Sequence, residues 1–240
     1  MGLLNWVKKG ILIIICIALM ISLLAMNALF VVSSSLSHDN IKQSLKPFII
    51  SEIYKNTTQT GIDANFNEMQ IYCQNNSEFN VANGYDFSIS CANILNGTSE
   101  SIVDSQVDKL IDDFYYKSYD CSFWQCIQDN PFFLISEESH EYFKNNFYIS
   151  FVISLILAGL VFLLVSFKRN MLVIIGILLI LSSLPFANLD SVSNLITPNI
   201  GNFLGVLFKQ SYVIFLITFI LGIILLAAGI ALKIWNSKKK

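Results

Sequence analysis

Four long apolar segments without charged residues divide this chain of 240 residues and constrain its fold more than any other feature. A helix over the first segment, 11–32, would rise about 33 Å at about 1.5 Å per residue, enough to cross a bilayer core of about 30 Å. The segments 147–167, 171–187 and 211–232 have the same apolar character. We therefore expect an all-α membrane protein with four transmembrane helices.

The first segment also resembles a secretory signal, because Lys8 and Lys9 precede it. Its apolar run is longer than the usual signal core of about 7–15 residues. No small-x-small cleavage site stands out near Ala25, and Ile15 before Cys16 disfavours a lipoprotein-type cleavage. We expect an uncleaved membrane anchor.

Basic and acidic residues separate along the chain. Lysine or arginine, without any acid, occurs in segments 1–10, 168–170 and 233–240. Basic residues near the ends of spans favour the cytoplasmic side, so we expect a cell-membrane protein with both termini cytoplasmic. All 17 acidic residues then lie outside, in segments 33–146 and 188–210.

These boundaries produce alternating membrane and soluble segments. Residues 192–208 are moderately apolar, but Pro198 interrupts them, so we expect an interfacial or re-entrant segment instead of a fifth span. The expected order is a cytoplasmic N-terminus (1–10), span one (11–32), an extracytoplasmic domain (33–146), span two (147–167), a cytoplasmic turn (168–170), span three (171–187), an outer loop (188–210), span four (211–232) and a basic cytoplasmic tail (233–240).

The domain inserted between spans one and two carries most of the soluble character of the chain. Segment 33–146 has 16 acidic residues and six lysines, so we expect it to bind no nucleic acid. It also has four of the five cysteines, and an even number in an exported domain suggests two disulfides. Three connectivities are possible, of which neighbour pairing is the simplest; the four cysteines are Cys73, Cys91, Cys121 and Cys126.

Periodicity indicates that this domain is mainly helical. Apolar residues recur at helical spacing over 41–53, where Pro47 is expected to kink or break the helix. Ser101 followed by Asp104 resembles a capping box at the start of another amphipathic helix. Short strands at 69–73 and 87–91 are also expected.

Three Asn-x-Ser/Thr sequons lie in the same domain and are candidate glycosylation sites of a glycoprotein. They begin at Asn56, Asn75 and Asn96. Because asparagine is common in this chain, some of these matches are expected by chance.

Aromatic residues cluster around the two closely spaced cysteines. The ordinary interpretation is that they form the core of the domain around a disulfide. The functional interpretation is a partner-binding or membrane-resting surface with Trp124 as its anchor, flanked by Phe123 and Tyr119.

Several polar residues have both a functional and an ordinary interpretation. His38 and His140, each beside acidic residues, would form a metal site only if their segments pair, and two exposed polar residues is the favoured interpretation. The acids at Asp104, Asp108 and Asp112 are spaced by four, which we interpret as a solvated helix face and not a calcium site.

Polar and small residues within the spans favour helix packing. Asn27 is the most polar of them and is expected to join helices, although a groove lined by Asn27 and serines would favour transport. Two small-x3-small pairs, Ser154 with Ala158 and Ala227 with Ala231, suit close helix contact.

The chain has no H-E-x-x-H, G-x-S-x-G or P-loop motif, so we expect no enzyme activity, no catalytic residue, no metal site and no cofactor. The leading hypothesis is a multi-pass cell-surface protein in the lipid bilayer, whose extracellular domain binds another protein or an envelope component, or forms a homo-oligomer. The alternative is a channel, permease or transporter-complex subunit. A further alternative is an extracytoplasmic ligand sensor that acts through a partner.

Overall fold

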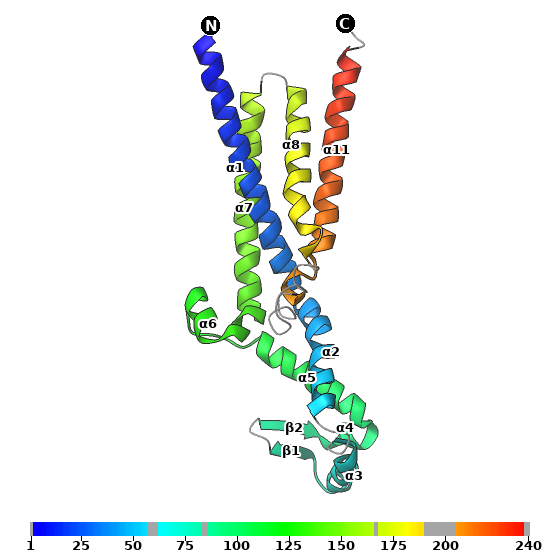
Figure 1. The fold of residues 1–240 in the computed structure, drawn as a ribbon. Coiled ribbons are helices and arrows are strands. Elements are labelled where there is room, and N and C mark those ends of the chain that lie inside the picture. Colours follow the sequence, from blue (N-terminus) through cyan, green and yellow to red (C-terminus); the bar gives the residue numbers. More distant parts are fainter. Residues whose placement is uncertain (1, 57–61, 83–85, 166–167, 190–204, 238–240) are drawn as a thin grey trace. The chain divides into compact units, whose positions relative to one another are not determined.

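A computed structural model describes residues 2–56, 62–82, 86–165, 168–189 and 205–237 of the chain (Figure 1). The fold is mainly helical and divides into two compact units. Unit 1 comprises 1–37, 123–125 and 138–240, and unit 2 comprises 38–122 and 126–137.

Unit 1 is a bundle of long helices that lie side by side. The start of α1, the end of α7, the start of α8 and the end of α11 lie at the same end of this bundle (Figure 1). The chain therefore passes along the bundle in alternating directions. Its elements are α1 (Gly2–Ser35), α7 (Glu137–Leu164), α8 (Lys168–Ser183), the 3-10 turn η2 (Leu184–Phe186) and α11 (Ser211–Ser237).

Three helices are long and apolar enough to cross a membrane by length and composition. They cover Trp6–Ser35, Glu137–Leu164 and Gly205–Trp235, which is consistent with a membrane protein. The apolar helix over Asn170–Phe186 is shorter; the 16 residues of α8 would rise only about 24 Å. Pro185 follows α8 within the turn η2, so the fourth expected span stays a prediction.

The expected re-entrant segment 192–208 lies largely outside the described residues. Only its end is described, where residues 205–208 form a helical turn before α11 begins at Ser211. The expectation for this segment therefore stays a prediction.

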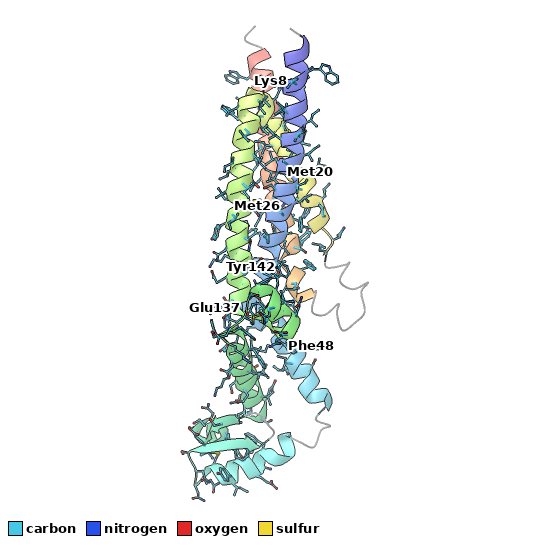
Figure 2. All side chains as sticks on the ribbon, turned by 90° about the vertical axis from the view of Figure 1, so that its left-hand side faces the viewer. Lys8, Met20, Met26, Phe48, Glu137 and Tyr142 are labelled. Atoms are coloured by element: carbon cyan, nitrogen blue, oxygen red, sulfur yellow. A yellow bond between two sulfur atoms is a disulfide. The ribbon has the colours of Figure 1, made fainter. Side chains whose placement is uncertain are left out.

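The bundle exposes large apolar side chains, as the sticks of Figure 2 show along its helices. In α1, Ile14 and Ile21 are 68% and 62% exposed, and in α7 Leu163 is 73% exposed. An apolar surface of this extent would be unfavourable in water but is stable against lipid tails. The exposed side chains therefore agree with the span assignment.

The interior of the bundle has small residues where helices approach most closely. A Cβ added at Gly176 of α8 would lie 2.7 Å from the backbone nitrogen of Leu226, and one at Gly222 of α11 would lie 3.0 Å from the Gly176 carbonyl oxygen. Backbones can approach this closely only where a side chain is missing. The expected pair Ala227 and Ala231 is exposed instead, so that part of the packing prediction was wrong.

Unit 2 combines short helices with one antiparallel hairpin. Strands β1 and β2 pair with Phe79 opposite Ile89. Its elements are α2 (His38–Asn56), α3 (Ile62–Cys73), β1 (Glu78–Ala82), β2 (Asp86–Ser90), α4 (Cys91–Asn96), α5 (Ser99–Tyr115) and η1 (Pro131–Ile135), while α6 (Phe123–Asp129) contributes to both units.

The expected strand at 69–73 is wrong, because these residues form the last part of α3. Phe66, Met69 and Cys73 are spaced by three and four residues and pack together against Ile89. That spacing presents one face of a helix to a core. The second expected strand, 87–91, overlaps β2 and ends one residue early, since Cys91 begins α4.

The two longest helices of unit 2, α2 and α5, differ from the sequence prediction. The difference in α2 concerns Pro47, and the difference in α5 concerns its first residue. Helix α2 runs through Pro47 without ending there. Helix α5 begins at Ser99, because Thr98 is its N-cap: the Thr98 hydroxyl accepts from the Ser101 amide, and the Thr98 amide donates to the Ser101 hydroxyl. The capping box thus starts at Thr98 and not at Ser101.

Candidate functional site

The four cysteines of unit 2 form two pairs at disulfide-bonding distance. Cys73, the last residue of α3, pairs with Cys91, the first residue of α4, with a Cα–Cα distance of 4.9 Å. Cys121 pairs with Cys126 in α6 at 5.5 Å. These are the neighbour pairs that were the simplest of the three connectivities. Cys73, Cys91 and Cys126 are buried, so both pairs belong to the packed interior.

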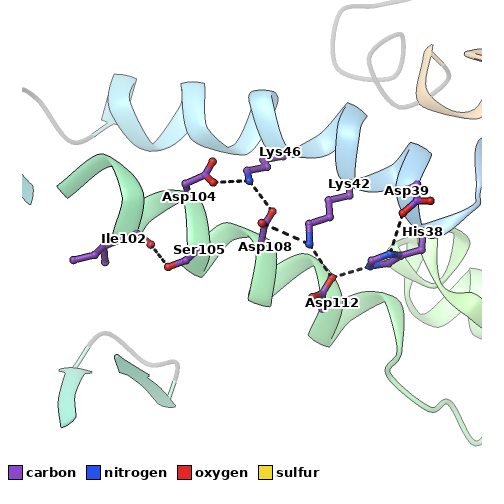
Figure 3. A network of polar contacts seen from close by, with 9 residues as sticks. All are labelled: His38, Asp39, Lys42, Lys46, Ile102, Asp104, Ser105, Asp108 and Asp112. Carbon is purple, nitrogen blue, oxygen red and sulfur yellow. Dashed lines mark hydrogen bonds and ion pairs between the residues drawn. The ribbon is translucent and has the colours of Figure 1, made fainter. Parts of the chain in front are cut away.

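A ladder of charged side chains joins α2 and α5 within unit 2 (Figure 3). Each helix contributes one residue per four positions, so successive side chains lie on one face. Lys46 Nζ lies 2.7 Å from Asp104 and 2.9 Å from Asp108, and Lys42 Nζ lies 3.6 Å from Asp108. We call this set the charge ladder; it comprises His38, Lys42 and Lys46 from α2 and Asp104, Asp108 and Asp112 from α5.

The charge ladder shows that the acidic stripe on α5 is only partly a solvated face: the Asp104 and Asp112 side chains stay 50% and 41% exposed, but the stripe faces α2. Its three carboxylates each pair with a basic residue of α2. Hydrogen bonds to Asp104 and then Asp108 raise the pKa of Lys46 above its ordinary value. The matching signal was present in the sequence, because His38, Lys42 and Lys46 have the same spacing as the acids.

The two histidines have different partners, each within its own unit. His38 Nε2 donates to Asp112 Oδ1 at 2.7 Å and closes one end of the charge ladder. His140 Nδ1 donates to the carbonyl oxygen of Ser33 at 2.8 Å and so links α7 to the end of α1. Among the residues that the structure describes, no group of three or more metal-binding side chains comes together. The histidines act as structural contacts in this fold.

The three aromatic residues proposed as a partner surface lie in different surroundings. Tyr119 is half-buried, with its ring 5.1 Å from the ring of buried Phe133. Phe123 stacks on Tyr142 of α7, with ring centroids 3.7 Å apart and planes 13° from parallel. Trp124 alone is largely exposed, at 68%. Tyr119 and Phe123 thus pack within the fold, whereas the interpretation of Trp124 as a partner-binding or membrane-resting anchor stays a prediction.

The sequons differ in how much of them the structure describes. Asn75 and Asn96 are exposed. The Asn96 side chain donates to the Ala92 carbonyl at 3.0 Å, at the end of α4. Asn56 is the last residue of α2, and the remainder of its sequon lies outside the described residues.

A polar cluster joins three helices inside the bundle of unit 1. Asn27 of α1 is 2% exposed. Its Oδ1 accepts from Thr218 of α11 at 3.1 Å, and its Nδ2 donates to the backbone and hydroxyl of Ser182 in α8 at 3.4 Å. Ser22 and Ser154 make a similar contact between α1 and α7 at 2.8 Å. Asn27 thus joins helices, as the sequence suggested.

Fold and sites together define a mainly helical protein with three candidate membrane spans. Its two cysteine pairs belong to a compact unit whose residues lie, in sequence, between the first and second of these spans. No protein-family model, no curated protein and no solved structure matches the chain.

Proposed function

We propose that this is a non-enzymatic, multi-pass cell-surface membrane protein whose outer domain, built mainly of unit 2, binds another protein or an envelope component. The observation that carries the proposal is the construction of unit 2. It has its own buried core, two cysteine pairs and the charge ladder. A small unit reinforced in this way keeps its surface in one conformation, which reduces the entropy lost on binding a partner.

The proposed topology has four spans, with α8 as the third. Two further observations support it. The helix ends that carry Lys8, Lys168 and Lys233 lie at one end of the bundle (Figure 1), as the preference of basic residues for the cytoplasmic side requires. Pro185 and the turn η2 extend the apolar stretch of α8 to Phe186. In this topology both termini are cytoplasmic and the glycosylation sites are outside.

The partner surface that we favour lies on α3 of unit 2. Ile71 and Tyr72, consecutive in this helix, are 64% and 48% exposed, although the same helix buries Cys73. Adjacent exposed apolar side chains on an otherwise acidic domain suit the centre of a protein interface. The excess of acids over lysines in segment 33–146 favours a partner with a basic surface.

The alternatives of a transport subunit or a ligand sensor receive less support. A transport path through the bundle would use polar groups such as Asn27, but the Asn27 amide already bonds with Ser182 and Thr218. A sensor acting through a partner would use the same outer surface, so it differs from the leading proposal only in its output.

Site-specific photo-crosslinking in the native membrane tests the proposal. A photoreactive residue at Ile71 or Tyr72 is expected to give one discrete adduct, whereas the same residue at exposed Lys109 of α5 gives none. Ile71→Asp should abolish co-purification of that partner while both cysteine pairs still form. Adducts that are equally frequent at Lys109, or co-purification that survives Ile71→Asp, would reject this surface. An adduct of twice the chain mass would identify a homo-oligomer.

Glycosylation mapping tests the orientation separately. A new sequon placed after Lys240 should stay unmodified in a glycosylating host, whereas Asn75 or Asn96 is expected to be modified. Modification of the C-terminal sequon would overturn the proposed sidedness.

A further inference from the structure

An exposed tryptophan lies beside the helix that enters the membrane. Trp124 is 68% exposed, while its neighbour Phe123 is half-buried. Phe123 stacks face to face on Tyr142 of α7 and also contacts Phe143 edge-on, at 5.5 Å between ring centroids. Phe123 packs against the rings of both Tyr142 and Phe143. These contacts fix the backbone that carries Trp124 relative to α7 within unit 1.

The level of this contact along α7 follows from helix geometry. The charged and amide residues of α7 end at Asn146, and its uncharged apolar run begins at Phe147. Phe147 stacks on Phe30 of α1 at 4.8 Å, so both candidate spans reach the edge of their apolar segments together. Tyr142 precedes Phe147 by five residues, or roughly 7 Å along the helix axis.

That distance matches one headgroup layer. The apolar core of a bilayer is about 30 Å thick, and about 40–45 Å with both headgroup layers, which leaves roughly 5–8 Å for each layer. With Phe147 at the edge of the core, Tyr142 lies within or at the surface of the headgroup layer. The ring of Trp124 lies 5.3 Å from that of Phe123, which stacks on Tyr142, so the indole lies close to the level of this layer.

We propose that Trp124 inserts into the lipid headgroup layer at the N-terminal end of α7 and anchors α6 to the membrane surface. An indole ring suits this layer, since its apolar body contacts the upper acyl chains while its N–H reaches water and carbonyl oxygens. The Cys121–Cys126 pair closes a short loop around Trp124 and so limits its conformational freedom. Phe123 is the positioning residue, and Trp124 is the lipid contact.

This anchor is independent of the partner surface on α3 and depends only on α7 crossing the membrane. It concerns the bilayer that the protein itself spans, and it needs no second protein. The exposed face of Trp124 would be occupied even in a purified, reconstituted protein.

Depth-dependent quenching of Trp124 fluorescence tests the proposal. The full chain with Trp6→Phe and Trp235→Phe retains Trp124 as its only tryptophan and is reconstituted in phosphatidylcholine vesicles. Lipids brominated near the top of the acyl chain should quench Trp124 more than lipids brominated near the chain end, and aqueous iodide should quench it weakly. The matched control keeps Trp6→Phe and Trp235→Phe and adds Trp124→Phe with Tyr72→Trp. Its single tryptophan therefore lies on α3 of unit 2.

The control is expected to show the reverse pattern, with iodide quenching about two-fold stronger than for Trp124 and little effect of brominated lipid. Equal iodide quenching of the two proteins would overturn the anchor and leave Trp124 available to a protein partner. Stronger quenching by the deeper bromines would overturn it as well, since the ring would then lie in the apolar core.

A second variant separates the positioning role of Phe123 from a general loss of folding. Phe123→Ala removes the stack on Tyr142, so iodide quenching of Trp124 should rise toward that of the control. Phe132→Ala, at a ring that is 65% exposed, should leave the quenching unchanged. Unchanged quenching in Phe123→Ala would show that Phe123 does not position the anchor.

Discussion

The ammonium of Lys46 lies 2.7 Å from the carboxylate of Asp104, which is 58 residues away in sequence and on another helix. Asp108 Oδ1 forms an ion pair with the same ammonium at 2.9 Å. The contact fixes the antiparallel register of α2 and α5. If one helix shifted by one turn along the other, each basic residue would face the neighbouring acid, and the residues at the ends of the charge ladder would lose their partners.

Removing this lysine should loosen α2 from α5. Lys46→Ala leaves Asp104 and Asp108 close together without their shared cation, which we expect to cost about 1 kcal/mol, because the Lys46 side chain is only 23% exposed and belongs to a network. Faster hydrogen exchange of α5 amides would report the loss. Lys109→Ala, on the exposed face of α5, is the matched control and should leave the exchange unchanged.

The same ion pairs predict a loss of stability at alkaline pH. The hydrogen bonds to Asp104 and Asp108 raise the pKa of Lys46, so the stabilisation is fully present below the ordinary lysine pKa of about 10.4 and is lost as the pH rises through the higher folded value. Thermal unfolding of unit 2, measured from about pH 9 to about pH 12, should show this loss of stability. Lys46→Arg should flatten it, since a guanidinium stays charged there; an equal decline in both proteins would contradict the assignment.

The two cysteine pairs should differ in their contribution to stability. Cys73 and Cys91 are separated by 18 positions, and Cys121 and Cys126 by five. Chain entropy predicts a loss of about 3 kcal/mol for Cys73→Ser with Cys91→Ser and about 2 kcal/mol for the other double variant. Urea unfolding of unit 2 in the reconstituted protein measures both. A larger loss from the Cys121–Cys126 pair would contradict the order.

Packing between α8 and α11 should not tolerate a methyl group at Gly176. Its Cβ would lie 2.7 Å from the backbone nitrogen of Leu226 and 2.8 Å from the carbonyl oxygen of Gly222, and backbone atoms cannot rotate away as a side chain can. We expect Gly176→Ala to destabilise the bundle by about 1–3 kcal/mol, measured as thermal unfolding in lipid nanodiscs.

Gly159→Ala in α7 is the control for that substitution, because no atom lies within 4 Å of its added Cβ. It should be neutral or slightly stabilising, since alanine favours helix more than glycine does. Similar losses at both positions would show that the close approach of α8 and α11 is not the cause.

Features that depend on short stretches of sequence could be predicted. The apolar segments of α1, α7 and α11 are visible because lipid selects for composition over a whole helix length. The neighbour pairing of cysteines follows from the low entropy of short loops. Asn27 was expected to join helices, since an amide in an apolar segment needs a partner.

Features that depend on a distant partner could not be predicted from one helix at a time. The acids of α5 have the pattern of a solvated face until α2 is placed beside them. Residues 69–73 are short enough to fit a strand, and only packing of Met69 with Phe66 on one face identifies the helix. The role of Gly176 depends on Gly222, which lies 46 positions later and is in contact only after the helices pack.

The hydrogen bond from His140 to Ser33 joins the two points where the chain leaves the bundle and returns to it. The long insertion between α1 and α7 therefore begins and ends at neighbouring points of the bundle, and its residues 123–125 also pack within unit 1 through Phe123 on Tyr142. Such an attachment allows the insertion to be exchanged by recombination for a different domain, or for a brief linker, without separating α1 from α7.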